Sequence, residues 1–138
     1  MEFERLSIPD VLLIRPLMHF DERGAVFEVF RNEELRLVGV REAFVQENFS
    51  ISHKVGVLRG LHFQRPPRAQ AKLVHCIRGS IFDVAVDIRL GSPTYGAHVS
   101  CILSAKDHEQ LWIPAGFAHG FCTLEPNCEV IYCVTDYY

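Results

Sequence analysis

The segment 71–89, AKLVHCIRGSIFDVAVDIR, constrains the fold of this chain more than any other stretch. In its second half, the apolar side chains of Phe82 and every second residue after it alternate with a set that includes Asp83 and Asp87. This two-residue period is typical of a β-strand with two different faces. A glycine in the central RGS supplies the positive φ of a tight turn, so we predict a hairpin of two strands here.

Short apolar segments separated by turn residues make up most of the remaining chain. A single helix is predicted over 31–39, RNEELRLVG, with Gly39 as its stop, and Pro16 is expected at an edge or bend of the first strand. The other predicted strands are 11–20, 25–30 after a turn at 21–24, 43–52, 56–64, 97–105, 110–124 and 128–138, with a loop at 65–70. Strands spaced by turns roughly every 8–12 residues indicate an antiparallel sandwich or barrel. We therefore predict an all-β fold with one short helix, in a single domain over 1–138.

Composition and charge exclude several classes of protein. The formal net charge of −3 gives no concentrated basic face for nucleic acid, and no apolar run is long enough to cross a membrane. The N-terminus, MEFERLSIPD, lacks the apolar stretch of a secretory signal. The five cysteines contain no CxxC pair and their number is odd, which is typical of reduced thiols. We therefore expect a cytoplasmic protein of the ordinary soluble class.

Polar side chains interrupt strands whose inward positions should be apolar. The set is Arg59, His62, Lys72, His75, Asp83, His119 and Tyr132. Each alone is more often solvent-facing or structurally hydrogen-bonded, but their concentration in central strands is typical of a cavity between two sheets. His62 is then a catalytic base, a metal ligand or a tolerated polar residue. Strict alternation places Arg59 and His62 on opposite faces, and a bulge at Gly60 would bring them to the same one.

The segment 113–121, IPAGFAHGF, carries a more specific motif. Its Pro114, Gly116 and His119 match the second motif of the cupin superfamily. Metal-binding cupins have HxH in their first motif, whereas this chain reads HFQ over 62–64, and a transition metal needs about three protein ligands. We therefore expect no metal site and give His119 either a structural role or a polar contact to a substrate.

Seven blocks in order resemble one family, the dTDP-4-dehydrorhamnose 3,5-epimerases, a metal-free branch of the cupins. The blocks are DERG, FVQENFS, GVLRGLHFQ, AQAKLVHCIRGSIFDVAVDIR, SPTYG, LSAKDHEQLWIPAGFAHGF and YCVTDYY. The resemblance implies a cupin-type jelly roll that works without a cofactor. It also implies an epimerase of a dTDP-linked 4-keto-6-deoxy sugar, which removes protons next to the C4 ketone and returns them from the opposite face.

The resemblance also assigns roles to single residues. It places the base at His62, the opposing acid at Tyr132 and the group that stabilises the enolate at Lys72. Arg59 and Arg23 would meet the diphosphate, where a guanidinium suits phosphate oxygens. The other residues at positions that line the family's site are Glu28, Gln46, Asn48, His119 and Tyr138, the last of them near the nucleotide base.

Family members are homodimers that exchange N-terminal strands, so Arg23 and Glu28 are expected to serve the partner's site. The sequence departs from the family in two places. Ala25 and Val26 stand where the family often has an aromatic run, and the sequence ends before a tail whose Asp hydrogen-bonds the catalytic His. Asp83 is either a replacement for that Asp or a structural carboxylate.

Three other functions remain open from the sequence. One is a non-catalytic cupin that binds a sugar nucleotide. Another is a related enzyme that epimerises a single carbon or acts as a 3,4-ketoisomerase. The third, a metal-dependent dioxygenase, is disfavoured by the missing second histidine at Gln64.

Overall fold

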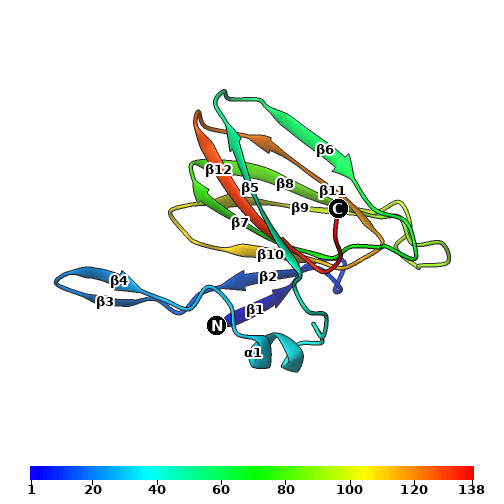
Figure 1. Cartoon of the computed structure of the whole chain (residues 1–138), viewed down its shortest axis with the longest axis horizontal. Helices are drawn as coiled ribbons and strands as arrows, with labels where there is room; N and C mark the ends of the chain where they lie inside the picture. Colours follow the sequence, from blue (N-terminus) through cyan, green and yellow to red (C-terminus); the bar gives the residue numbers. More distant parts are fainter.

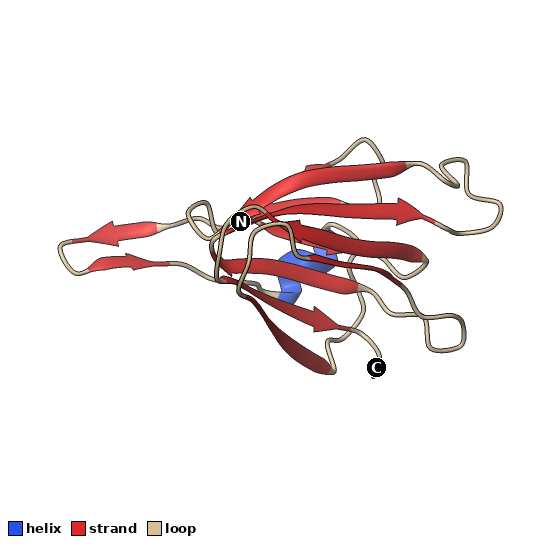
Figure 2. Cartoon of the chain, turned by 90° about the horizontal axis from the view of Figure 1, so that it is seen from above, coloured by secondary structure: helices blue, strands red, loops and turns tan.

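The computed structural model describes residues 1–138 and confirms the predicted all-β, cupin-type class (Figure 1). A six-stranded and a four-stranded antiparallel sheet face each other, and a two-stranded hairpin projects away from both in the two perpendicular views (Figures 1 and 2). The one helix is too short to cross a bilayer.

The strands of each sheet come from distant parts of the chain. The six-stranded sheet has the order β1 (Glu2–Arg5), β2 (Leu12–Arg15), β10 (Gln110–Ile113), β7 (Lys72–Arg78), β12 (Cys128–Val134) and β5 (Gln46–Ser52). The four-stranded sheet has the order β6 (Leu58–His62), β11 (Phe117–Thr123), β8 (Ser80–Asp87) and β9 (His98–Ser104). The projecting hairpin consists of β3 (His19–Asp21) and β4 (Gly24–Val26), and the helix α1 spans Asn32–Leu37.

The hairpin predicted over 71–89 is wrong, although both of its strands exist. β7 and β8 flank a turn at Gly79, whose φ is +75°, as the glycine suggested. However, β7 pairs with β10 and β12, whereas β8 pairs with β9 and β11. The turn therefore carries the chain from one sheet to the other. A turn sequence specifies a local change of direction, and distant strands decide which sheet each arm joins.

The face of β8 that carries the carboxylates is the buried one. Asp83 and Asp87 are 0% exposed, like Ile81 and Ala85 beside them, whereas Phe82 on the opposite face is 42% exposed. A buried carboxylate is tolerated only when it is paired, and each of these two has a basic partner. The strand alternates as predicted, with the polar set facing inward.

Two hydrophobic cores lie on the two faces of the six-stranded sheet. The core between the sheets packs side chains such as Val74 and Leu111 against Phe117 of the four-stranded sheet. The second core packs Trp112 and its neighbours against Leu35 of α1. Burial of Leu35 contributes about 1.5–3 kcal/mol to the docking of α1. The central strands of this sheet are apolar on both faces because both faces are covered.

The helix forms where the sequence predicts it. Glu33 and Glu34 lie in its first turn and Arg36 in its last, an arrangement that stabilises the helix dipole. The backbone leaves the helix at Gly39, whose φ of +101° favours glycine. The helix prediction over 31–39 is therefore confirmed.

The N-terminal strand predictions need correction. Pro16 divides the predicted strand 11–20 into β2 and β3, and β4 ends at Val26, although a strand was expected over 25–30. The segment after Val26 is held by side-chain contacts and not by backbone pairing with a strand. The ring centroids of Phe27 and His108 are 4.7 Å apart. The side-chain amide of Gln110 donates a hydrogen bond to a backbone carbonyl of this segment. With no strand beside it, the apolar run does not form sheet.

Asp87 organises the loop that follows β8. Its carboxylate accepts bonds from Nε of Arg89 at 3.0 Å and from the second terminal nitrogen at 2.8 Å. The hydroxyls of Ser92 and Thr94 donate to it at 2.5 and 2.6 Å, and Arg89 also pairs with Asp10 at 2.7 Å. The Arg89 guanidinium, helped by the two hydroxyls, holds the pKa of Asp87 far below its usual range.

Asp87→Asn is expected to lower the free energy of unfolding at pH 7 by about 2–4 kcal/mol, because a buried network loses its charge. The pKa of Asp87 is lower in the folded state, so the stabilisation is complete above an unfolded pKa of about 3.9 and is lost as pH falls through the folded value. Denaturant unfolding at pH 7 and at pH 2 should therefore show the wild type and variant converging at low pH. An equal gap at both pH values would contradict the prediction.

Candidate active site

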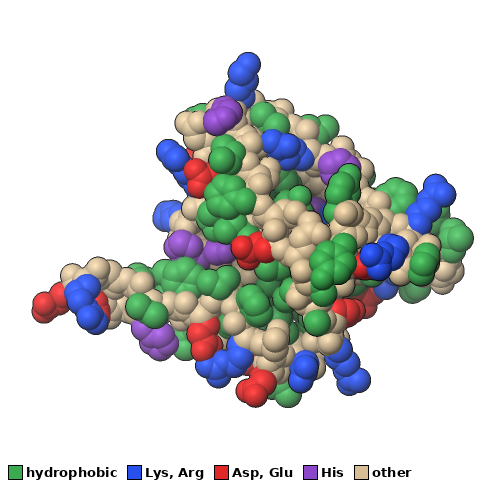
Figure 3. Space-filling model, in the orientation of Figure 1, with side chains coloured by type: hydrophobic (Ala, Val, Ile, Leu, Met, Phe, Trp, Pro, Cys, Tyr) green, Lys and Arg blue, Asp and Glu red, His purple; other side chains and the backbone are tan.

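A cavity of about 570 Å³ opens between the sheets where β5 and β6 form their edges. Its lining consists of Phe49, Ser50, Ile51, Leu58, Arg59, Gly60, His62, Lys72, His119, Phe121 and Tyr132. A second hollow of about 290 Å³ shares three of these residues, His62, Lys72 and Tyr132. These three side chains therefore stand where the two spaces meet. The space-filling view shows histidine and basic atoms among hydrophobic ones on this part of the surface (Figure 3).

A bulge in β6 brings Arg59 and His62 to the same cavity. His62 pairs with His119 and Arg59 pairs with Phe121, so β6 has one more residue than β11 between these two pairs. Gly60 lies in the bulge with a φ of +119°. This confirms the conjecture that a glycine-associated irregularity offsets the alternation of the strand.

The bulge depends on a close approach of two backbones. A Cβ atom placed on Gly60 would lie 2.6 Å from Cα of Gly120, and one placed on Gly120 would lie 2.7 Å from the carbonyl oxygen of Arg59. Both distances are shorter than real Cβ contacts allow. Only glycine at both positions lets β6 and β11 approach this closely.

The opposite wall of the cavity carries Lys72 and Tyr132. Lys72 begins β7 and is 9% exposed, and Tyr132 lies on the neighbouring strand β12. Burial lowers the pKa of the Lys72 ammonium, and the charge of Asp83 opposes this shift. His62 comes from the four-stranded sheet, and Lys72 and Tyr132 come from the six-stranded sheet. A ligand in the cavity therefore meets the imidazole from one wall and the ammonium and phenol from the other.

Arg59 is anchored beside the cavity. Its Nε donates to Oγ of Ser52 at 3.0 Å and a terminal nitrogen donates to the carbonyl of Ile51 at 2.9 Å. Both acceptors belong to β5, so the side chain bridges the edges of the two sheets across the mouth of the cavity. A guanidinium held in this way leaves further donors for an anion.

Asp83 contacts a different histidine from the one suggested by the sequence. Both of its carboxylate oxygens lie 2.9 Å from Nε2 of His119, which lines the cavity and is 6% exposed. The structure gives Asp83 no bond to His62. The suggestion that Asp83 orients His62 is therefore replaced by an Asp83–His119 pair.

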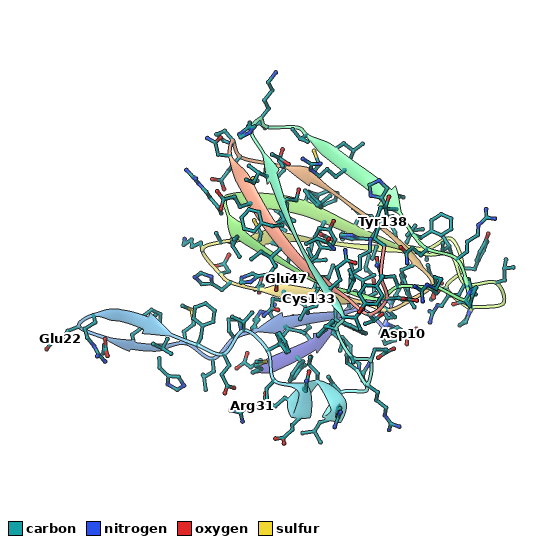
Figure 4. All side chains as sticks on the ribbon, viewed as in Figure 1. Asp10, Glu22, Arg31, Glu47, Cys133 and Tyr138 are labelled. Carbon is teal, nitrogen blue, oxygen red and sulfur yellow. The ribbon has the colours of Figure 1, made fainter.

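The second hollow gathers most of the remaining predicted residues. Asn48 and Tyr138 line it, and Gln46 donates to Oδ1 of Asn48 at 2.8 Å while accepting from the backbone N–H of Tyr138 at 3.2 Å. Tyr138 is 96% exposed and lies beside the end of β6 (Figure 4). Gln46 thus holds Asn48 and the backbone of Tyr138 in place, although it does not line the hollow itself.

Sequence reasoning missed several residues of the cavities. The main cavity has an apolar rim that includes Phe49, Leu58 and Phe121, and the second hollow includes Gln64 and Gln70. Gln64 directly precedes the proline-containing loop 65–70 and Gln70 is its last residue, a placement that could have marked them as site residues. The apolar rim carried no such signal because its residues resemble ordinary strand residues.

Arg23 and Glu28 are not at the cavity of their own chain. Arg23 lies between β3 and β4, is paired with Asp21, and has a side chain that is 90% exposed. Glu28 follows the hairpin and pairs with Arg31. Glu22, at the tip of the hairpin, and Tyr138, at the second hollow, lie at well-separated places in the molecule (Figure 4). No group of three or more His, Cys, Asp or Glu side chains is arranged to hold a metal ion.

Comparison with known proteins identifies the family. The family model described as dTDP-4-dehydrorhamnose 3,5-epimerase matches residues 5–138. The chain belongs to the dTDP-4-dehydrorhamnose 3,5-epimerase family. A family member from Sinorhizobium fredii is 53% identical over 138 residues, which are 100% of this chain and 71% of that relative.

Solved structures of the dTDP-4-dehydrorhamnose 3,5-epimerase family share the fold. The structure from Bacillus anthracis with TDP and PPi bound has a TM-score of 0.96 and 44% identity, and the match covers 99% of this chain and 78% of that one. The structure from Legionella pneumophila in complex with dTDP-4-keto-L-rhamnose has a TM-score of 0.93 and 47% identity, covering 99% of this chain and 72% of that one. The resemblance seen in the sequence and its jelly-roll fold are thereby confirmed.

Proposed function

We propose that this protein converts dTDP-4-dehydro-6-deoxyglucose to dTDP-4-dehydrorhamnose by inverting C3 and C5, a step of deoxysugar and rhamnose biosynthesis. The observation that carries the proposal is the placement of His62 on one wall of the cavity, with Lys72 and Tyr132 on the other. Epimerisation needs a base and an acid on opposite faces of the sugar, and this arrangement supplies both. Substrate and product are isomers, so the reaction requires no redox cofactor.

His62 is proposed as the base. It takes the proton from the carbon next to the C4 ketone, and the electrons of the broken C–H bond move to the ketone oxygen to form an enolate. An imidazole is suited to this step because its unperturbed pKa of about 6.5 lies close to the working pH. The imidazolium then returns its proton to solvent.

Lys72 and Tyr132 are proposed to act from the opposite wall. The Lys72 ammonium stabilises the negative charge that develops on the ketone oxygen, which is most effective in a water-poor cavity. The phenol of Tyr132 donates its proton to the enolate carbon, which re-forms the ketone and completes the inversion, and the phenolate then regains a proton from solvent. With an unperturbed pKa of about 10, a phenol transfers its proton readily only to a strong base such as this carbon.

Arg59 is proposed to bind the diphosphate at the mouth of the cavity. Its anchoring on β5 supports this role, because it fixes a cation beside the space that would hold the sugar. Asn48, Gln46 and Tyr138 are proposed to bind the remainder of the nucleotide at the second hollow.

The test is solvent-deuterium exchange with dTDP-4-dehydro-6-deoxyglucose. We expect deuterium at both C3 and C5, and a product that NMR identifies as dTDP-4-dehydrorhamnose. Tight dTDP binding without exchange would instead show a non-catalytic sugar-nucleotide-binding protein. Label at one carbon, or a 3-keto product, would show a single-carbon epimerase or a ketoisomerase.

A homodimer with exchanged N-terminal strands is part of the proposal. The support is the projecting hairpin, which carries Arg23 and leads to Glu28 while contributing nothing to the cavity of its own chain. In such a dimer, Arg23 of one subunit would join Arg59 of the other at the diphosphate. We also propose a cytoplasmic location, which suits the five free cysteines.

Subunit mixing tests the exchanged arrangement. Arg23→Ala and His62→Asn should each be poorly active alone, since one weakens diphosphate binding and the other removes the base. Dissociation and reassociation of the mixture should restore exchange activity, because the mixed dimer has one site with both native residues. A mixture no more active than its components would contradict the arrangement, provided that size-exclusion chromatography shows mixed dimers.

A further inference from the structure

Asp83 is a buried carboxylate beneath the cavity that the proposed mechanism does not use. It is 0% exposed and projects from β8, where its neighbours in register are Phe121 of β11 and Cys101 of β9. It is absent from the cavity lining, whereas His119 and Lys72 belong to that lining. Any effect of Asp83 on a ligand must therefore pass through a neighbouring side chain.

The side chain that Asp83 contacts is His119, and this contact fixes the position of the hydrogen on its ring. An ionised carboxylate only accepts hydrogen bonds, so Nε2 of His119, at 2.9 Å from both oxygens, carries the hydrogen. In the neutral ring, Nδ1 then holds a free lone pair. His119 is nearly buried and its ring is held in place, so it offers the cavity one defined hydrogen-bonding edge.

We infer that Asp83 is a positioning residue for His119, holding its ring in a single tautomer. The inference deepens the proposed function, on which its catalytic consequence rests. A substrate analogue would meet a fixed imidazole edge, although the carboxylate that fixes it stays out of its reach.

The test compares Asp83→Asn with the wild type. Asparagine keeps the size of the side chain, but its amide can donate to Nε2 of His119, so the ring is no longer held in one tautomer. For deuterium exchange, kcat/KM should fall roughly 10- to 100-fold, the loss seen when a group that orients a metal-bound imidazole is removed.

Asp87→Asn is the matched control. Asp87 lies on the same strand, is equally buried and contacts neither His119 nor Lys72. This variant should lose stability while keeping the wild-type kcat/KM. If Asp83→Asn also keeps the wild-type kcat/KM, or if both variants lower it equally, a merely structural role is shown and the inference is overturned.

A second readout does not depend on turnover. Imidazole ¹⁵N shifts should show His119 protonated at Nε2 in the wild type, and a changed tautomer balance in Asp83→Asn, because an amide can donate to that nitrogen. Unchanged shifts would overturn the inference. If the wild type exchanges no deuterium, the proposed function fails, and these shifts still decide the role of Asp83.

His119→Gln keeps the test open if Asp83→Asn does not fold. Glutamine lacks the imidazole edge that Asp83 holds toward the cavity, so kcat/KM should fall in this variant too. A wild-type kcat/KM in His119→Gln would overturn the inference.

Discussion

His62→Asn is expected to lower the rate of deuterium incorporation by about 10²–10⁴-fold, the range supplied by a positioned general base. Asparagine fills similar space and keeps polar contacts but cannot accept a proton at neutral pH. NMR of the sugar in D₂O measures the rate, and calorimetry with dTDP checks that nucleotide binding persists. Binding should change little, because His62 acts at the sugar in the proposed mechanism.

His98→Asn is the matched control for His62→Asn. His98 lies on β9 in the four-stranded sheet, exposed and away from both hollows. It should exchange deuterium at the wild-type rate. If His62→Asn also exchanged at that rate, the assignment of the base would be wrong, and if both variants slowed equally, the effect would be unspecific.

Gly60→Ala is expected to destabilise the protein by at least about 3 kcal/mol, through a strained backbone and a steric overlap together. The added Cβ would lie 2.6 Å from Cα of Gly120 and 2.7 Å from the carbonyl oxygen of His119. Both are backbone atoms, so no side chain can rotate away to relieve the contact. β6 would have to separate from β11, which moves Arg59 and His62 relative to the opposite wall.

Gly56→Ala separates backbone strain from steric overlap. Gly56 has a φ of +76°, but a Cβ there would meet nothing within 4 Å. Its cost should be about 1–2 kcal/mol, the penalty for a left-handed backbone alone. Denaturant unfolding measures both variants, and equal losses would show that the close approach of β6 and β11 is not the source of the larger effect.

From the sequence, the positions of individual strands were predicted better than the strands with which they pair. Local alternation identified the strand that contains Asp83 and Asp87, since a period of two is a property of consecutive residues. It could not say which face is buried, because the inward face carries carboxylates paired with Arg89 and His119, which lie elsewhere in the chain. The turn at Gly79 was misread as a hairpin for the same reason.

For the site, the sequence predicted which polar residues come together but not all of their contacts. His62, Lys72 and Tyr132 do meet around one space, and the bulge at Gly60 explains how Arg59 joins them. The partner of Asp83 was not predictable, since His119 lies 36 positions away and comes within reach only because β11 pairs with β8, where Phe121 is opposite Asp83 and His119 is opposite Ala85. The family resemblance identified polar residues, whereas the apolar rim of the cavity resembled ordinary core.

The strand order of the six-stranded sheet has a consequence for how the protein folds. β2 pairs with β10, and β5 pairs with β12, so each of these ladders joins segments that lie far apart in the sequence. Such non-local pairing requires large loops to close early, and proteins of this kind fold in milliseconds to seconds. During synthesis on the ribosome, β2 and β5 emerge long before β10 and β12. Until then, the backbone N–H and C=O groups that pair with those strands stay unpaired. The yield of folded protein from overexpression should therefore depend on slow synthesis or on chaperones that cover the unpaired strands.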